Sequence, residues 1–344
     1  MKLCIVMTNL KIGGSERKMV KLANYLSDKG ISVSILTLKF SRDEVLVGEL
    51  NSSVKVLYFG SKLEFFRYLF VNKVDNFFLL NSYPLFFSFL FRVGNPRSRI
   101  FYLNNTSVYA DGKLKLLLIK FSAMFCNGIV FGAKAQLCYW NYQYGFNINK
   151  SMVIYNGVDV ECFKNDIELQ SKFEIVMVGQ VRPEKNYFQA VNCIKLLVDD
   201  GFDVSLNIVG GGKGLVQLRD YISNLNLTAY INLHGEVYDV KKYLEVARIF
   251  LLCSNKVETF SNAVLEAMSM GKIVIISDIG GAREMIDHGV NGYIFEVNNT
   301  EDLKQCIIKA FDDKSDLLAN NARKTVLEKF TSINMMRSYM RLLK

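Results

Sequence analysis

The stretch CSNKVETFSNAVLEAMSMGKIVIISDIGGAREMIDHGVNGYIFEV, residues 253–297, decides how the rest of the chain is interpreted. It runs from a polar loop through a helix-forming segment into the apolar run Lys272 to Ser277 and a glycine turn. Such an apolar run suits a strand that is buried on both faces, as strands of parallel sheets are. Open parallel sheets bind ligands where their strands end. The stretch therefore predicts an α/β fold with a ligand site beside residues 278–281.

Two glutamates in this stretch, Glu258 and Glu266, stand on different elements. Each residue turns a helix by about 100°, so two residues at this spacing do not share a helix face. Ser261 or Asn262 is suited to cap the helix, which leaves Glu258 in the preceding loop and Glu266 in the first turns. The amides of residues 259–261 would then lie at the positive end of the helix, where phosphate or sugar oxygens bind. Two solvated glutamates at a helix end are the alternative interpretation.

The whole stretch resembles the EX7E segment of GT4-type retaining glycosyltransferases, the glycosyl transferases group 1. This family has the GT-B fold of two facing Rossmann-like domains with parallel sheets. Thr259 departs from the family, which usually has Gly at this position. The resemblance implies that Glu266 accepts hydrogen bonds from the ribose of a nucleotide-sugar and Glu258 from hydroxyls of the sugar. It is carried, in order, by Glu258, Phe260, the run LEAM at 265–268, Gly271, Gly280-Gly281, Glu284 and Asn291-Gly292.

The loop GQVRPEKN at residues 179–186 resembles the family's GR-xxx-KG loop, whose Arg and Lys hold the donor's diphosphate. Lys185 matches directly, whereas Gln180 occupies the usual Arg position and Arg182 stands two residues later. Cations bonded to phosphate stabilise a leaving group that departs as an anion. Two surface cations in a turn are the alternative.

The sequence thus yields a set of candidate donor-site residues. Glu258, Lys185 and Arg182 are the catalytic candidates. The full donor-binding set is Gly13, Gly14, Gly179, Arg182, Lys185, Gly211, Glu258, Phe260, Ser261, Asn262 and Glu266.

The chain begins with an apolar run at residues 3–8, the pair Gly13-Gly14, a helical pattern and a second apolar run at 31–38. This order predicts a βαβ unit with the glycines at the carboxyl edge of a parallel sheet. Gly13-Gly14-Ser-Glu-Arg17 resembles the family's GG-x-ER loop, which approaches the donor diphosphate or the acceptor. Arg17 is therefore a candidate residue on the acceptor side.

The run at residues 101–107 predicts another strand that ends at the ligand-facing edge. Many members of the family carry a His near this point, but this chain has Asn104 and Asn105, and its only histidines are His234 and His288. Asn104 and Asn105 are acceptor-side candidates because an amide can donate or accept a hydrogen bond. An ordinary loop role is equally open.

The length of 344 residues predicts roughly two domains. We expect an acceptor-binding domain at residues 1–155, joined by a C-terminal helix at 332–344, and a nucleotide-sugar-binding domain at 170–331. The chain starts without a secretion signal pattern. Its seven cysteines have no paired spacing, so reduced core thiols and a cytoplasmic location are expected.

The net charge of +9 is concentrated in the first half of the chain. Residues 1–160 carry 20 Lys and Arg against 9 Asp and Glu. Nucleic acid and an anionic membrane both attract such a charge, but the aromatic segment at 65–91 favours the membrane. We expect helices at 84–93 and 113–126, each with a basic rim, to lie at the inner face of the cytoplasmic membrane. Ordinary core helices are the alternative.

No Asp-x-Asp motif or His/Cys cluster offers ligands for a metal, so no metal cofactor is expected. No enzymatic nucleophile is evident either, which favours a same-face attack assisted by the leaving phosphate. The resemblance implies a retaining, metal-independent glycosyltransferase that moves a hexose-type sugar from a nucleotide-diphosphate sugar to a glycan acceptor. The acceptor would be lipid-linked, as in cell-surface polysaccharide (O-antigen or capsule) biosynthesis.

Two other classes of protein are alternatives. A catalytically degenerate GT-B subunit that binds lipid or a partner transferase would account for Gln180, Thr259 and the missing His. A Rossmann dehydrogenase would need a glycine fingerprint and a following acidic residue, which this chain lacks.

Overall fold

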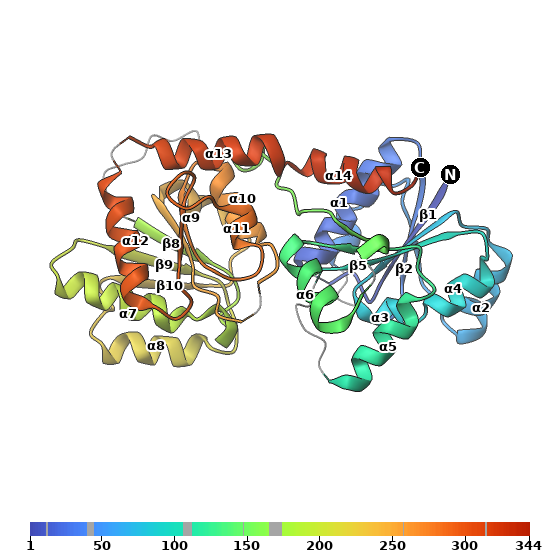
Figure 1. Ribbon diagram of the computed structural model, residues 1–344, viewed down its shortest axis with the longest axis horizontal. Coiled ribbons are helices and arrows are strands. Elements are labelled where there is room, and N and C mark those ends of the chain that lie inside the picture. Colours follow the sequence, from blue (N-terminus) through green and yellow to red (C-terminus); the bar gives the residue numbers. More distant parts are fainter. Residues whose placement is uncertain are drawn as a thin grey trace. The chain divides into compact units, whose positions relative to one another are not determined.

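The computed structural model describes residues 1–11, 13–39, 45–105, 112–146, 148–164, 174–256, 258–313 and 315–344. The chain divides into two compact units. Unit 1 comprises Met1–Tyr155 and Met335–Lys344, and unit 2 comprises Asn156–Asn334. Each unit contains one sheet, and every strand pairing among the described residues of the two sheets is parallel (Figure 1). The expected α/β architecture of two Rossmann-like domains is therefore confirmed.

The sheet of unit 1 has the strand order β3-β2-β1-β4-β5-β6-β7. The strands β1 and β2 are those of the predicted βαβ opening, and they pair with each other over six residues. The strands are β1 (Lys2–Met7), β2 (Ser32–Thr37), β3 (Lys55–Leu57), β4 (Asn76–Leu80), β5 (Arg99–Asn104), β6 (Gly128–Phe131) and β7 (Ser151–Val153).

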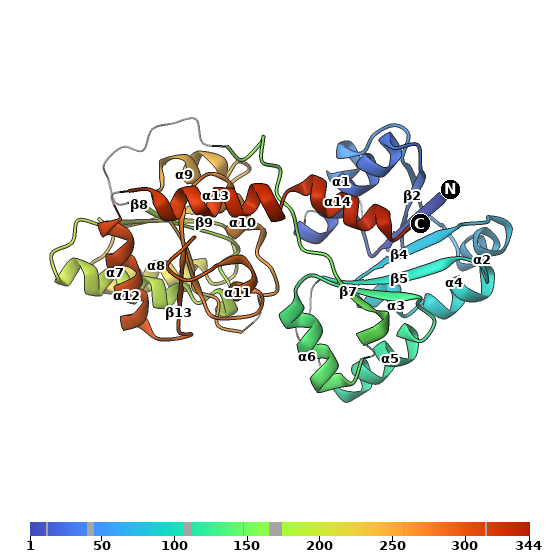
Figure 2. The same ribbon diagram turned by 45° about the horizontal axis from the view of Figure 1, so that its top comes forward.

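Two groups of helices cover the two faces of this sheet (Figures 1 and 2). On one face, α1 and the end of α14 share a core cluster with alternate residues of β1. On the other face, α2, α4, α5 and α6 contribute to a second, aromatic-rich cluster. The helices are α1 (Gly14–Asp28), α2 (Lys62–Val71), α3 (Ser82–Leu85), α4 (Ser88–Gly94), α5 (Lys113–Ala123), α6 (Lys134–Tyr144) and α14 (Ser332–Arg341).

One predicted helix of unit 1 was wrong in its extent. Residues 84–93 form two short helices, α3 and α4, which are separated by a turn at Phe86 and Phe87. The second helix starts at Ser88, whose buried hydroxyl donates to the carbonyl of Ser122 at 2.6 Å. This tertiary hydrogen bond places α4 against α5, which local sequence patterns do not reveal.

The sheet of unit 2 has the strand order β10-β9-β8-β11-β12-β13. Helices α7, α8 and α12 share a core cluster on one face, while α10 and α13 pack together on the other (Figures 1 and 2). The strands are β8 (Glu174–Val178), β9 (Ser205–Val209), β10 (Ile231–Gly235), β11 (Ile249–Leu252), β12 (Ile273–Ser277) and β13 (Tyr293–Phe295). The helices are α7 (Tyr187–Asp199), α8 (Leu215–Asn224), α9 (Lys241–Val246), α10 (Asn262–Ser269), α11 (Ala282–Met285), α12 (Thr300–Asp312) and α13 (Leu317–Lys329).

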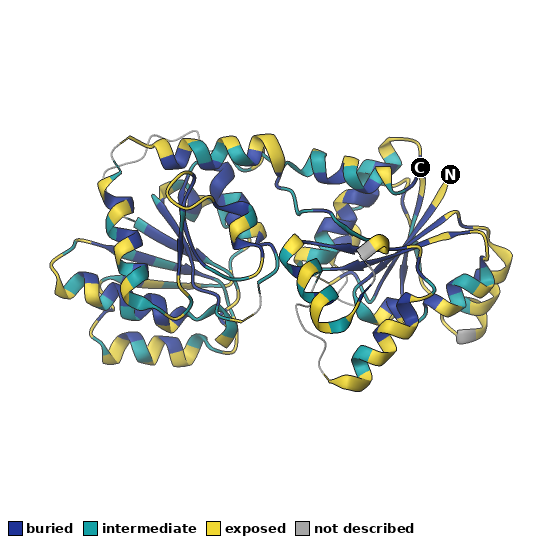
Figure 3. Ribbon diagram, viewed as in Figure 1, coloured by how far each residue is buried: buried dark blue, intermediate teal, exposed yellow. Residues whose placement is uncertain are grey.

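The decisive stretch folds as its pattern predicts. All five residues of β12 are buried (Figure 3), and β12 lies between β11 and β13. Ser261 caps α10 by accepting a hydrogen bond from the amide of Val264. Gly271, just beyond the helix, has the left-handed φ of +65° that favours glycine at a helix end. Because the strands are parallel, the loops that follow β8, β11 and β12 gather at one edge of the sheet.

Candidate active site

Two loops of unit 2 bring a lysine and a glutamate into direct contact. Lys185 ends the short 3-10 helix Pro183–Lys185 after β8, and Glu258 lies in the loop between β11 and α10. The Nζ atom of Lys185 donates to Oε2 of Glu258 at 2.5 Å. Their side chains are only 16% and 14% exposed, so this ion pair is mostly shielded from water. The sequence named both residues but did not predict that they pair with each other.

Backbone hydrogen bonds fix the positions of these loops. The amide of Asn255 donates to the carbonyl of Glu184 at 2.9 Å, which joins the loop after β11 to the loop after β8. The amide of Gly281 donates to the carbonyl of Thr259 at 2.9 Å, which joins the loop after β12 as well. The Lys185–Glu258 pair is therefore held by three loops of one sheet edge.

The start of α10 provides the predicted helix N-terminus beside Glu258. The Phe260 ring is buried and packs edge-on against Phe330, with ring centroids 5.2 Å apart. The Phe260 carbonyl accepts a hydrogen bond from Nδ2 of Asn156 at 2.9 Å. Phe260 is thus a packing residue, so a ligand can meet only its backbone. Asn262 is exposed, and Glu266 is partly exposed within α10.

A cavity of about 620 Å³ lies at the same edge of the sheet, between the loops after β8, β9 and β10. Gly179 and Gly211, both predicted donor-site residues, line it together with Arg182. The loops approach so closely that a Cβ atom at Gly210 would lie 1.9 Å from the carbonyl oxygen of Gly179. The hydroxyl of Tyr187 donates to that same carbonyl at 2.7 Å, which fixes the loop. A cavity of this volume can hold a small ligand that consists of a planar ring and attached phosphates.

Arg182 differs from Lys185 in its surroundings. Its side chain is 52% exposed, and Nε lies 3.5 Å from Oε1 of Glu184. The loop therefore presents Arg182 at the rim of the cavity, whereas Lys185 lies with Glu258.

The acceptor-side candidates lie in unit 1, at the carboxyl end of its sheet. Asn104 ends β5 and is buried, and Asn105 follows it. The guanidinium of Arg17 donates to Oε1 of Glu49 at 3.1 Å in an exposed ion pair. Gly13 and Gly14 lie at the start of α1, before Arg17. Unit 1 therefore brings Gly13, Gly14, Asn104 and Asn105 to one edge of its sheet. Arg17 instead contacts Glu49 at the surface.

A residue that the sequence did not single out, Lys18, meets Asn105 instead. Lys18 lies in α1 and is buried, and its Nζ donates to Oδ1 of Asn105 at 2.8 Å. Nζ also lies 6.0 Å from the ring centroid of Tyr339 in α14. Burial lowers the pKa of the Lys18 ammonium to about 7. The sequence did contain a signal for this residue, because Lys18 directly precedes the apolar residues that begin at Met19. A lysine on the buried face of a helix is unusual and therefore indicates a special role.

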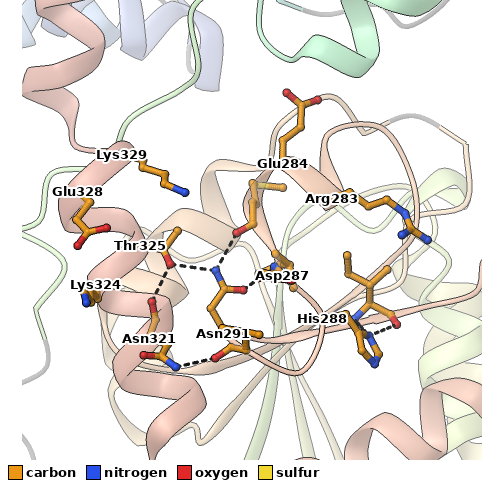
Figure 4. Close-up of a pocket in the computed structure, with 14 residues that line it drawn as sticks. Arg283, Glu284, Asp287, His288, Asn291, Asn321, Lys324, Thr325, Glu328 and Lys329 are labelled. Carbon is orange, nitrogen blue, oxygen red and sulfur yellow. Dashed lines mark hydrogen bonds between the residues drawn. The ribbon is translucent and has the colours of Figure 1, made fainter.

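A second cavity of unit 2, about 590 Å³, lies between α13 and the segment from α11 to β13 (Figure 4). Part of its polar lining forms a hydrogen-bond network. Asn291 donates to Oγ1 of Thr325 at 3.0 Å and to the carbonyl of Met285, and Asn321 donates to the carbonyl of Val290 (Figure 4). This network joins the Asn291-Gly292 turn, one of the motifs that carry the resemblance, to α13, so the turn has a structural role here.

Within the described ranges, no three or more His, Cys, Asp or Glu side chains come together in a way that could hold a metal ion. The described helices also include none that combines the length and apolar character needed to cross a bilayer.

Comparison with known proteins finds a matching family model and several similar relatives. Residues 160–325 match the family model described as "Glycosyl transferases group 1". A Haemophilus influenzae protein, named an uncharacterized glycosyltransferase, is 26% identical over 320 residues, which are 90% of this chain and 87% of that protein. The Escherichia coli UDP-Gal:alpha-D-GlcNAc-diphosphoundecaprenol alpha-1,3-galactosyltransferase is 28% identical over 199 residues, covering 54% of this chain and 51% of that protein.

The fold has a close match among solved structures. The crystal structure of Anabaena Alr3699/HepE in complex with UDP gives a TM-score of 0.89 over 100% of this chain and 99% of that one, at 18% identity. The two-sheet architecture is therefore the GT-B fold, and the chain is a glycosyltransferase. Residues 160–325 match the model of the glycosyl transferases group 1, the family that the motifs resemble.

Proposed function

We propose that this glycosyltransferase transfers a hexose-type sugar from a nucleotide-diphosphate sugar to a glycan acceptor, with retention of the anomeric configuration. The observation that carries the proposal is the Lys185–Glu258 pair beside the N-terminus of α10. The cavity between the loops after β8, β9 and β10 lies at the same edge of the sheet. In this assignment the base and ribose occupy the cavity, and Glu266 accepts from the ribose hydroxyls. Lys185 and Arg182 bind the diphosphate, and Glu258 bonds to the sugar.

The diphosphate would be neutralised by protein groups alone. Lys185 and Arg182 supply two cations, and the amides at residues 259–261 supply the positive end of a helix of eight residues. We propose that the reaction needs no metal ion. Activity that persists in excess chelator supports this, and activity that returns only when a divalent cation is restored contradicts it.

We also propose that the acceptor is lipid-linked and belongs to cell-surface polysaccharide biosynthesis. The name of the Escherichia coli relative describes a diphosphoundecaprenol-linked acceptor for that protein. Our support in this chain is the outer surface of α2, α4 and α5 in unit 1, where many residues are exposed (Figure 3). Large apolar side chains are among these exposed residues. We define this apolar surface as Leu63, Phe66, Phe70, Val71, Phe89, Val93, Leu114, Leu117, Leu118, Phe121 and Met124.

The charge on this surface favours an anionic bilayer as its partner. Lys113, Lys115 and Lys120 lie on α5 among the exposed apolar residues, with Arg67 on α2. Each cation near an anionic membrane contributes about 1 kcal/mol, and exposed apolar side chains add insertion into the headgroup region. We propose that unit 1 docks here on the cytoplasmic face of the membrane, where lipid-linked glycans are presented.

Donor screening tests the central proposal. The purified protein should be stabilised against heat by one class of UDP-, GDP- or dTDP-sugar more than by the others, because a ligand that binds the native state stabilises it. Proton NMR of the product should show the anomeric configuration of the donor. A protein that binds a nucleotide-sugar but turns over none in the presence of lipid-linked acceptors would instead be the degenerate subunit.

A further inference from the structure

Ser254 makes a contact with Glu258 that the donor-binding assignment does not use. It follows β11 by two residues and is fully buried. Its hydroxyl Oγ donates to Oε2 of Glu258 at 3.3 Å. Its carbonyl oxygen accepts a hydrogen bond from Oγ of Ser277, at the end of β12, at 2.5 Å. Ser254 therefore links Glu258 to the ends of the neighbouring strands β11 and β12.

The two side chains that bond to Glu258 converge on one of its oxygens. Lys185 and Ser254 both donate to Oε2, at 2.5 Å and 3.3 Å. Within the described part of the chain, Oε1 of Glu258 takes part in no hydrogen bond. The carboxylate is thus anchored through one oxygen and presents the other, which can accept a hydrogen bond from a sugar hydroxyl.

The two anchors differ in what a diphosphate would do to them. Phosphate oxygens compete for the Lys185 ammonium, because charge-assisted bonds to phosphate are among the strongest that lysine makes. Ser254 has no charge, is buried and is fixed through its own backbone, so the diphosphate does not draw it away. When Lys185 turns to the phosphates, Ser254 is the side chain that still holds Glu258.

We propose that Ser254 is a positioning residue, which keeps Glu258 oriented toward the sugar after donor binding has taken Lys185 from the ion pair. This inference rests on the proposed function. It assigns the Lys185–Glu258 pair to the protein without donor and the Ser254–Glu258 hydrogen bond to the complex with donor. The 3.3 Å distance is consistent with a contact that tightens when its competitor leaves.

The test compares Ser254→Ala with Ser254→Thr, which retains a hydroxyl. Ser254→Ala should lower kcat for sugar transfer, or for donor hydrolysis, by about tenfold or more, which is the typical effect of losing a hydrogen bond to a charged group. The affinity for the nucleoside diphosphate, measured by calorimetry, should change less than twofold. Ser254→Thr should restore part of kcat.

Ser269→Ala is the matched control, because Ser269 is also buried and donates to a backbone carbonyl, that of Phe163 at 2.6 Å. It should lose stability without losing kcat. A double-mutant cycle sharpens the test: in a Glu258→Gln background, adding Ser254→Ala should lower kcat little further, since Ser254 acts through Glu258.

Three outcomes overturn the inference. They are a wild-type kcat in Ser254→Ala, an equal loss of nucleoside diphosphate affinity and kcat, and full additivity in the cycle. A wild-type protein that turns over no donor would overturn the proposed function and this inference together. An active wild type with an equally active Ser254→Ala variant would overturn this inference alone.

Discussion

Gly280 lies directly against the backbone of Glu258. Its φ is +58°, and a Cβ atom at this position would lie 1.7 Å from the Glu258 carbonyl oxygen. No side chain can occupy that space without moving one of the two loops. The glycine turn after β12 therefore sets the distance between that strand and the loop that carries the proposed sugar-binding carboxylate.

Gly280→Ala is expected to displace the Glu258 loop and to abolish donor turnover. It should also destabilise the protein by more than the roughly 1 kcal/mol of an alanine at positive φ, because the clash adds to the strain. Gly289→Ala is the control, since Gly289 has φ +77° but an added Cβ would meet nothing within 4 Å. For both variants, chemical denaturation measures the stability and a turnover assay measures the activity. Equal effects of the two variants would show that the contact with Glu258 is unimportant.

Lys185→Ala and Glu266→Ala should each weaken donor binding while the fold is retained. Loss of a hydrogen bond to a charged group costs about 1.5–3 kcal/mol, or roughly 10- to 150-fold in affinity. Calorimetry with the donor identified by screening measures this, and circular dichroism checks the fold. Unchanged affinity in either variant would remove that residue from the donor site.

Glu258→Gln should separate turnover from nucleotide affinity. The carboxylate is proposed to bond to the sugar, whose charge changes in the transition state, so kcat should fall by about tenfold or more. Because Lys185 is no longer held by a negative partner, the affinity for the nucleoside diphosphate should stay the same or rise. A parallel fall in diphosphate affinity would contradict the assignment of Glu258 to the sugar.

Local patterns predicted the parts of the site that depend on neighbours in sequence. The buried strand β12, the cap at Ser261 and the left-handed Gly271 each follow from residues a few positions apart. The pairing of Lys185 with Glu258 does not, because it joins residues 73 positions apart through the register of two loops.

The same limit explains the two main omissions in unit 1. Burial of Lys18 depends on Asn105, which follows β5, and on Tyr339 of α14, and both come from distant parts of the chain. The break between α3 and α4 depends on the hydrogen bond from Ser88 to α5. Periodicity reports which face of a helix is apolar, but it does not report what packs against that face.

Membrane docking predicts salt-sensitive binding to vesicles that contain phosphatidylglycerol. Changing Lys113, Lys115 and Lys120 together to Gln should reduce the fraction that sediments with the vesicles, because about 3 kcal/mol of electrostatic attraction is lost. Donor affinity should not change. The control removes the same charge from unit 2, through Lys242, Lys324 and Lys329, which are exposed. Equal sedimentation of the wild type with anionic and neutral vesicles at low salt would rule out docking through this surface.

The apolar residues can be tested separately from the charges. Leu117 and Phe121 on α5 are 64% and 56% exposed. Changing both to Ser should reduce vesicle binding that persists at high salt, since screening weakens the electrostatic part only. Binding that is abolished by salt alone in the wild type would show that the apolar side chains do not insert.

Lys18 should make stability depend on pH in a defined window. Its pKa is lowered from 10.5 to about 7 in the folded protein by burial, so between these values the unfolded chain binds the extra proton. The free energy of unfolding therefore rises with pH across this window, by at most about 1.4 kcal/mol per pH unit from this group. The free energy of unfolding of the wild type, minus that of Lys18→Met, should therefore be lower at pH 7 than at pH 9.

Lys21→Met is the matched control for that measurement, because Lys21 lies on the same helix and is exposed. Urea denaturation of the three proteins at several pH values gives the differences directly. A Lys18→Met difference that stays constant with pH would mean that Lys18 keeps its charge in the folded state.

Helix α14 carries the last residues of the chain into the core of unit 1. Met335, Met336, Tyr339 and Leu343 belong to the same cluster as β1 and α1. During synthesis, these four side chains emerge from the ribosome only after every residue of unit 2 has been made. Unit 2 can fold as soon as its own chain is complete, whereas the domain that is translated first must wait for its final ten residues before its core closes. The domain whose synthesis begins first is therefore the last to complete its core.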